Sequence, residues 1–388
     1  MPTQTMVFAQ IMDWIHPEQF RRCVTRYNGH YKVRHFSCWD QFLAMAFAQI
    51  TYRESLADIE VCLCSHHDQL YRLGFRSSVA HSTLADANGS RDWRIYADLA
   101  QGLITRARRL YAQEPLAVEL AQTVYALDST TIDLCLNLFS WARFRSTKAA
   151  VKLHTLLDLR GSIPTMITIS EGKQADVRVL DELFPEPGAF YIMDRGYLDF
   201  QRLYRFVLSS AFFVTRTKKG VKLNRLESRP VVKNTGVRSD HIVWLRNPGS
   251  VAHYPDRLRR VSYKDPETGQ ILVFLTNNFE LSALVITQLY KSRWQVELFF
   301  KWIKQNLRIK HFFGTSDNAV KTQVWIAICV YVLVAIMRKE LQLKLSLSQI
   351  LQVLSVNAFE QVPMAELFTN TQSQNIATDP CNQLLLWN

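Results

Sequence analysis

Three acidic residues, far apart in the sequence, are the residues best suited to chemistry. Asp128 follows the apolar run 124–127, and Asp194 follows the apolar run 190–193. A carboxylate at the end of a buried strand is costly to ionise unless a cation or hydrogen-bond donors neutralise it. Each aspartate alone could equally be a turn or helix-cap residue. Together with Glu297, however, they would form a three-carboxylate cluster, whose oxygen-only ligands select Mg²⁺ or Mn²⁺.

Glu297 also belongs to a stripe of polar residues on a helix predicted over residues 290–304. At 3.6 residues per turn, an arc of about 60° contains Tyr290, Arg293, Glu297 and Lys304. The broad, largely opposite face is apolar, as expected of a helix that packs on a core. A solvated face with an ordinary Arg293–Glu297 ion pair would give the same stripe. The two aspartates upstream are what favour an active site.

The elements that must position these residues begin near residue 122. Strand-like segments cover residues 123–131, 151–159 and 163–169, with a tight turn at Gly161 and Ser162. Two further strands and two helices are predicted beyond them, in the order 175–183 (helix), 189–193 (strand), 199–208 (helix) and 211–215 (strand). A three-stranded meander followed by this alternation predicts a mixed α/β sheet.

Residues 1–120 are predicted to be helical. Pro17 suits a first helical position, and the pairs Ser37/Asp40 and Ser55/Asp58 resemble helix caps. Several cations make this region basic: Arg21, Arg22, Arg26, Lys32, Arg34 and Arg53. Either a helical DNA-binding module or a merely solvated helical bundle would have this composition.

The charge of the chain favours a polyanionic partner. Forty-six Lys and Arg among 388 residues face 34 Asp and Glu, which gives a net charge of +12 and a pI near 9.4. The excess is spread through an aromatic-rich chain and is not confined to one tail, so nucleic acid is the expected partner. The seven cysteines are scattered, which fits a reducing cytosol better than a disulfide framework.

Other classes of protein are disfavoured. The longest apolar run, 324–337, is too short to span a bilayer and predicts a buried core helix. No G-x-x-x-x-G-K, G-x-G-x-x-G, H-E-x-x-H or G-x-S-x-G motif occurs in the sequence. We therefore expect no membrane, no nucleotide cofactor and a cytoplasmic location.

The motifs resemble those of one known family. The Y-(2)-R-(3)-E-(6)-K signature of bacterial DDE transposases of the insertion sequence 4 family is matched, with every spacing, by Tyr290, Arg293, Glu297 and Lys304. Asp128 in YALDSTTIDL and Asp194 in YIMDRGYLD look like the first and second catalytic aspartates of that family. The resemblance covers residues 124–314 and, more loosely, the preceding helical region.

The resemblance implies a ribonuclease-H-like catalytic domain with a β-rich insertion between the second aspartate and the glutamate. About 100 residues separate Asp194 from Glu297, too many for a short connection. Residues 240–245, 258–263 and 271–276 read as strands within that interval. The expected domains are residues 1–120 (helical, DNA-binding), 121–215 with 279–345 (catalytic), 216–278 (insertion) and 346–388 (C-terminal helices and tail).

The resemblance also implies a mechanism. Asp128, Asp194 and Glu297 would hold two Mg²⁺ ions, with Mn²⁺ as a substitute, and the ions would activate the attacking oxygen and stabilise the leaving oxygen of a phosphodiester. Tyr290, Arg293 and Lys304 would contact DNA phosphates. Further DNA contacts, or simply a solvated basic edge, are expected at Arg143, Arg145, Lys148, Lys152, Lys218 and Lys219.

The implied protein is a transposase that binds the terminal inverted repeats of its own element, cleaves the ends and joins the 3′-hydroxyl strands to target DNA. A homodimer on double-stranded DNA and a location at the bacterial nucleoid are expected from the same resemblance. Two alternatives remain open: a stand-alone nuclease of the same fold, and a non-catalytic DNA-binding derivative. The derivative would be expected to have lost at least one carboxylate, and all three are present.

Overall fold

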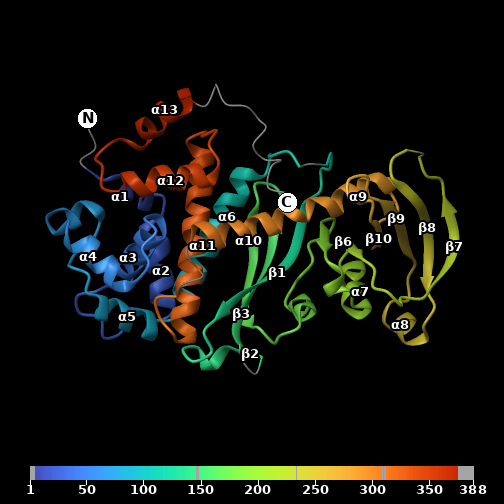
Figure 1. Ribbon diagram of the computed structural model, residues 1–388, viewed down its shortest axis with the longest axis horizontal. Helices are drawn as coiled ribbons and strands as arrows, with labels where there is room; N and C mark the ends of the chain where they lie inside the picture. Colours follow the sequence, from blue (N-terminus) through green and yellow to red (C-terminus); the bar gives the residue numbers. More distant parts are fainter. Residues whose placement is uncertain are drawn as a thin grey trace. The chain divides into compact units, whose positions relative to one another are not determined.

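The computed structural model describes residues 5–116, 118–145, 148–232, 234–307, 309 and 312–374 (Figure 1). Contacts between residues divide the chain into two compact units. The helical unit comprises Met1–Leu110 and Trp302–Asn388, and the sheet unit comprises Tyr111–Lys301. The boundary falls inside helix α10 (Trp294–Asn306).

The helical unit begins with helices that start at the predicted caps. Pro17 is the first residue of α2. The Ser37 hydroxyl accepts a hydrogen bond from the Asp40 N–H, and the Asp40 carboxylate accepts one from the Ser37 N–H, which completes a capping box. Ser55 caps the next helix through the Asp58 N–H. The N-terminal helices are α1 (Val7–Met12), α2 (Pro17–Arg26), α3 (Cys38–Ile50), α4 (Leu56–Cys64), η1 (His67–Leu73, 3₁₀), α5 (His81–Ser90) and α6 (Arg94–Tyr111).

The predicted apolar helix lies in the core of the helical unit. It is α11 (Asp317–Glu340), it contacts α3, α5 and α12 (Leu347–Asn357), and all its residues from 324 to 337 are buried. With 24 residues it is longer than its apolar run, and long and apolar enough to cross a membrane, but 94% of its most apolar window is buried inside the protein. That burial is the property of a core helix, as predicted.

The contacts of the C-terminal part of the chain connect it to the N-terminal helices. Residues 279–345 are predicted to belong to the catalytic domain, and the contacts group the chain from Trp302 onward with the N-terminal helices. The reason is that α11 packs on α3 and α5. The last described helix is α13 (Met364–Gln374), and the predicted tail beyond it lies outside the described residues.

The sheet unit is built on a ten-stranded mixed sheet in the order β2-β3-β1-β5-β6-β10-β9-β8-β7, with β4 paired to β3. β1, β3 and β4 form the predicted antiparallel meander, while β5 runs parallel to β1 and β6 parallel to β5. This arrangement is the ribonuclease-H-like sheet. Its strands are β1 (Val124–Leu134), β2 (Arg143–Arg145), β3 (Lys148–Asp158), β4 (Ile163–Glu171), β5 (Phe190–Met193) and β6 (Phe212–Arg216).

The insertion continues the same sheet. β10 (Ile271–Thr276) pairs antiparallel with β6, and β9 (Leu258–Lys264), β8 (Val237–Leu245) and β7 (Leu223–Arg229) follow outward (Figure 1). The sequence predicted β8, β9 and β10. It missed β7, an edge strand whose five central residues are all exposed and mostly polar, because such a strand has no apolar alternation.

Short helices flank the sheet. The predicted helix 199–208 is α7 (Phe200–Leu208), and the predicted helix 175–183 is a 3₁₀ helix, η3 (Asp176–Asp181). Other helical segments of this unit are η2 (Ser140–Ala142), η4 (Arg195–Tyr197), α8 (Pro248–His253) and α9 (Ala283–Ser292). A buried cluster that includes Leu127, Met193 and Phe213 forms the core beside Asp128, which lies within β1, and Asp194, which follows β5.

Candidate active site

Asp128 and Asp194 are placed at the same level of two neighbouring parallel strands. Leu127 pairs with Met193 in the β1–β5 ladder, so the two aspartates follow the same rung. Adjacent strands lie about 4.8 Å apart, which brings the two backbones close together. Both residues are half-buried. The two predicted acids are therefore neighbours in space although 66 positions separate them in the sequence.

The helix pair α9–α10 brings the third carboxylate to the aspartates. The Arg293 guanidinium donates hydrogen bonds to Asp128 Oδ2 and to Glu297 Oε1, the latter over 2.6 Å. The Tyr290 hydroxyl donates to Asp194 Oδ1 over 3.2 Å. The structure thus brings together five of the residues that the sequence singled out. Glu297 reaches Asp128 through Arg293 and not by direct contact of the carboxylates.

The helix that carries the polar stripe is divided at Arg293. One helix was predicted over residues 290–304, but α9 ends at Ser292 and α10 begins at Trp294. The Arg293 N–H donates to the Tyr290 carbonyl, and the Val296 N–H donates to the Arg293 carbonyl, so these bonds join residues three apart as in a tightened 3₁₀ turn. The Ser292 hydroxyl bonds the Leu289 carbonyl at 2.6 Å, a contact that often bends helices. Tyr290 therefore approaches Asp194 from one helix, and Glu297 belongs to the next.

Burial makes ionisation of Asp128 unfavourable. It raises the pKa of Asp128, and the negative charges of Glu297 and Asp194 raise it further. Arg293 and the Ser129 N–H oppose this rise, and the resulting pKa is about 6. A carboxylate with this pKa stays partly protonated near neutral pH unless more positive charge arrives.

The pKa values of Tyr290 and Arg293, the two hydrogen-bond donors on the helix pair, are both raised, so both groups keep their protons. Burial and the charge of Asp194 raise the pKa of Tyr290 to about 12, although Arg293 and Arg216 oppose the rise. Burial lowers the pKa of Arg293, but Asp128, Tyr290 and Glu297 outweigh it, so the net pKa is raised. The buried Arg293 Nε–H has no hydrogen-bond acceptor among the described residues. An acceptor supplied by a bound molecule would satisfy it.

Lys152 contacts an acid that the sequence did not single out. Its Nζ donates to Asp176 Oδ1 at 3.0 Å and to the Gln174 carbonyl at 2.9 Å. Asp176 also accepts a hydrogen bond from the hydroxyl of Ser129, the residue after Asp128. No motif marks Asp176, because η3 is short and its acid resembles an ordinary first-turn residue. Lys152 remains a predicted DNA contact that is held beside the strand of Asp128.

The other predicted basic residues are less closely tied to the carboxylates. Lys304 is half-buried on α10, about two turns after Glu297. Lys218 and Lys219 are exposed after β6, and the Lys218 Nζ donates to the Leu198 carbonyl at 3.2 Å. The remaining predicted residues lie on β2 (Arg143 and Arg145) and at the start of β3 (Lys148).

Arg216 is a cation of the site that the sequence analysis missed. Thr215 pairs with Met193 in the β5–β6 ladder, so Arg216 and Asp194 follow the same rung of parallel strands. The charge of Arg216 also acts on Tyr290. A signal was present in the sequence, because Arg216 comes two positions after the apolar run 211–214, and Asp194 comes directly after the run 190–193.

The donor set fits a hard divalent ion by type. The three carboxylates offer only oxygen, which suits Mg²⁺ and Mn²⁺. As placed, no three His, Cys, Asp or Glu side chains within the described ranges converge closely enough to hold one ion. Instead, the Arg293 guanidinium lies between Asp128 and Glu297 and supplies positive charge there.

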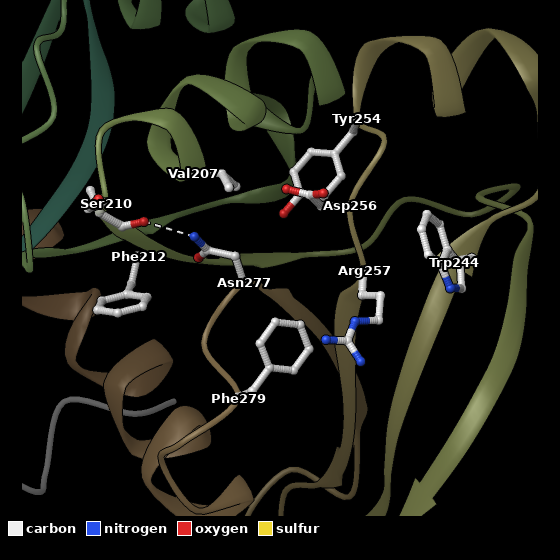
Figure 2. A pocket seen from close by; sticks show the side chains of 10 residues that line it. Val207, Ser210, Phe212, Trp244, Tyr254, Asp256, Arg257, Asn277 and Phe279 are labelled. Carbon is white, nitrogen blue, oxygen red and sulfur yellow. Dashed lines mark hydrogen bonds between the residues drawn. The ribbon is translucent and has the colours of Figure 1, made fainter.

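A separate hollow of about 530 Å³ lies elsewhere in the sheet unit (Figure 2). It is lined by Ser210 before β6, by Phe212 at the start of β6 and by Asn277 after β10, together with Trp244 and Arg257 of the insertion. Because β6 runs parallel to β5, these residues mark the end of the sheet opposite to Asp194. The hollow and the carboxylates are therefore distinct features.

Comparison with known proteins identifies the sheet unit. Residues 119–333 match the family described as "Transposase DDE domain", and residues 3–76 match a "Domain of unknown function (DUF4372)". The chain is 34% identical over 260 residues to "Putative transposase y4zB" of Sinorhizobium fredii, which covers 65% of this chain and 70% of that protein. It is 30% identical over 255 residues to "Probable transposase for insertion sequence element IS5377" of Geobacillus stearothermophilus, which covers 65% and 66%.

A solved structure resembles the chain more distantly. Its title is "Cryo-EM structure of piggyBac transposase synaptic complex with hairpin DNA (SNHP)". The TM-score is 0.47 at 11% identity, over 97% of this chain and 82% of the other.

The matched DDE domain covers more than half of the chain and contains Asp128, Asp194 and Glu297. Membership of this family implies an enzyme that acts on DNA and depends, in general, on divalent metal ions. The chain belongs to the family of transposases with a DDE domain.

Proposed function

We propose that this protein is a transposase of the insertion sequence 4 type, which cleaves the ends of its own element and joins the 3′-hydroxyl strands to target DNA. The observation that carries the proposal is that Tyr290 bonds Asp194, which follows β5, and that Arg293 bonds both Asp128, which lies within β1, and Glu297. The resemblance assigns Tyr290, Arg293 and Glu297 to the family signature, and Asp128 and Asp194 to the catalytic aspartates.

Asp128, Asp194 and Glu297 would hold two Mg²⁺ ions, for which Mn²⁺ could substitute. When bound, such ions activate a water or a 3′-hydroxyl and stabilise the oxygen that leaves the phosphorus. The raised pKa of Asp128 supports the assignment, since burial and two neighbouring acids favour a site that gains from added positive charge. Mg²⁺ at Asp128 and Glu297 would compete with Arg293 for the same oxygens, so Arg293 has to release at least one of them.

Arg293 then becomes available to the DNA. Its Nε–H already lacks an acceptor among the described residues, and a phosphate oxygen accepts such a donor well. Tyr290 and Lys304 would contact neighbouring phosphates, and Arg216 would add positive charge beside Asp194. Lys152, Lys218 and Lys219, together with Arg143, Arg145 and Lys148, would lie along the path of the DNA.

The helical unit would bind the terminal inverted repeats. Between α2 and α3, Tyr31 is 74% exposed, and Lys32 and Arg34 are exposed beside it. Gly29, just before these residues, is closely packed, because an added Cβ there would lie 2.8 Å from the Ile95 side chain. Arg21, Arg22 and Arg26 of α2, in contrast, pair with Glu18 or Asp98. We name residues 30–35 the basic loop and assign it to phosphate contact.

Two copies of the chain would act together on the two ends, in the bacterial cytoplasm at the nucleoid. The proposal is tested with linear DNA that carries the segments flanking the gene, which should end in inverted repeats. Purified protein with Mg²⁺ should cleave at the repeat boundary and join the 3′ ends to a second plasmid. Cleavage without joining would indicate a stand-alone nuclease, and binding without cleavage a non-catalytic derivative.

A further inference from the structure

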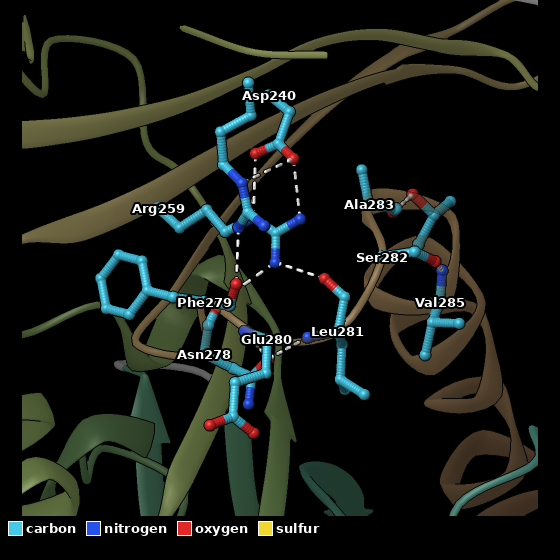
Figure 3. A network of polar contacts seen from close by, with 11 residues as sticks. Asp240, Arg259, Asn278, Phe279, Glu280, Leu281, Ser282, Ala283 and Val285 are labelled. Carbon is cyan, nitrogen blue, oxygen red and sulfur yellow. Dashed lines mark hydrogen bonds and ion pairs between the residues drawn. The ribbon is translucent and has the colours of Figure 1, made fainter. Parts of the chain in front are cut away.

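The insertion contains a buried ion pair in which one guanidinium bonds both oxygens of a carboxylate. Arg259 on β9 is 1% exposed and Asp240 on β8 is 3% exposed. The Arg259 Nε and Nη2 donate to the two Asp240 oxygens at 2.9 and 2.7 Å (Figure 3). A pair this deeply buried is weak evidence for stability, because desolvation offsets most of the attraction. The other contacts of Arg259 therefore say more about its role than the ion pair does.

The remaining Arg259 nitrogen reaches the connection between the insertion and the helix pair. Nη1 donates to the Leu281 carbonyl at 2.6 Å and to the Asn278 carbonyl at 3.3 Å (Figure 3). These carbonyls belong to residues 277–282, the linker between β10 and α9. Arg259, Asp240 and the two linker carbonyls are called the Arg259 anchor below.

Hydrogen bonds between its own residues also stabilise the linker. The Asn278 side-chain oxygen accepts hydrogen bonds from the N–H groups of Glu280 and Leu281. Ser282 then caps α9 by accepting a bond from the Val285 N–H. The anchored turn therefore leads directly into the first turn of α9.

The helix transmits this placement to the carboxylates. α9 is ten residues long, about 15 Å, and ends beside Tyr290 and Arg293. Tyr290 meets Asp194, and Arg293 meets Asp128, at the end of α9 remote from the anchor. A shift of the linker would move both contacts together.

We propose that Arg259 is a positioning residue: through the linker it sets where α9 holds Tyr290, Arg293 and, after the turn, Glu297 against the aspartates of β1 and β5. This inference rests on the proposed function and adds to it a role for the insertion, which orients the catalytic helix pair from outside the carboxylate site.

The test compares Arg259→Lys with Val243→Ala. Lysine can keep the charge pair with Asp240, but its single ammonium cannot reproduce the planar fork that also reaches two carbonyls. Val243 is a buried residue of β8 that packs in the core cluster and takes no part in the anchor, so its truncation destabilises the same insertion. Both variants are assayed at 25 °C, and their unfolding temperatures are measured in parallel.

Two readouts follow. Hydrogen exchange of residues 278–293 should accelerate at least tenfold in Arg259→Lys and stay unchanged in Val243→Ala. The kcat of Mg²⁺-dependent end cleavage should fall at least tenfold in Arg259→Lys with KM for DNA unchanged, whereas Val243→Ala should retain the wild-type kcat.

Unchanged exchange in Arg259→Lys would overturn the proposal even if the wild-type protein cleaves no DNA. A loss of kcat that merely follows the loss of unfolding temperature in both variants would also overturn it. Failure of the proposed function has a different signature, namely cleavage that persists in Glu297→Gln or is absent from the wild type.

Discussion

The Tyr290 hydroxyl donates a hydrogen bond to the Asp194 carboxylate over 3.2 Å, which joins α9 to the end of β5. The Tyr290 ring is buried and packs on Phe274, with ring centres 4.7 Å apart. The ring is thus held by the sheet, while the hydroxyl points at an acid of the site. Its role can be separated from its packing by removing the oxygen alone.

Tyr290→Phe should slow Mg²⁺-dependent cleavage by about threefold to tenfold, since one hydrogen bond contributes about 1 kcal/mol. DNA affinity measured without metal should change little, because the proposal assigns binding of the inverted repeats to the helical unit. Tyr125→Phe is the matched control: it removes a Tyr–Glu186 hydrogen bond of 2.7 Å at the start of β1. If both variants cleave equally slowly, the hydroxyl of Tyr290 has no special role.

Asp128→Asn should stabilise the metal-free protein at pH 7. The folded pKa of about 6 lies above the unfolded value, so the ionised carboxylate costs about 3 kcal/mol of folding free energy. Below about pH 4 both states are protonated and the cost vanishes, and it grows as the pH rises from about 4 to about 6. The unfolding temperature in EDTA should therefore diverge between wild type and variant over that window, with the variant higher. Parallel curves from pH 4 to pH 7 would contradict the raised pKa.

Divalent ions should raise the unfolding temperature of the wild-type protein. An ion that binds only the folded state at one hundred times its Kd adds about 2.7 kcal/mol. Titration of Mg²⁺ or Mn²⁺ should show this rise in the wild type and a much smaller one in Asp194→Asn. An equal rise in both proteins would place ion binding elsewhere.

The basic loop should contribute to phosphate binding. Replacing Lys32 and Arg34 by alanine together should lower DNA affinity about tenfold and reduce the slope of log K against log salt by about 2. Replacing Arg21 and Arg22, which already pair with Glu18, should have a smaller effect. Fluorescence anisotropy at several salt concentrations gives both quantities. A slope that stays unchanged in the loop variant would remove the loop from the interface.

Much of the catalytic sheet could be predicted from local patterns. The apolar runs before Asp128 and Asp194 marked where both acids lie, and the parallel β1–β5 pairing brings the two residues together. Asp194 follows the end of β5 as predicted. The prediction of a strand end at Asp128 was wrong, because β1 stays paired with β3 as far as Leu134. The helix caps at Ser37 and Ser55 were equally visible, because a cap depends only on residues three positions apart.

The rest depends on tertiary contacts that no local pattern contains. The division of the helix at Arg293 could not be read from helical periodicity, and the boundary at Trp302 follows from packing of α11 on α3 and α5. The Arg259–Asp240 pair could not be predicted for a similar reason. Asp240 was only the first residue of a predicted strand, and Arg259 lies 19 positions away on the next strand.

The central claim is that Asp128, Asp194 and Glu297 together hold the metal ions that cleave DNA. The most direct test measures Mg²⁺-dependent cleavage of DNA carrying the element ends, and binding to the same DNA, for Asp128→Asn, Asp194→Asn and Glu297→Gln. We predict that each variant loses cleavage by at least a thousandfold while its DNA affinity stays within about threefold of the wild type. Cleavage at the wild-type rate by any one of the three would contradict the account.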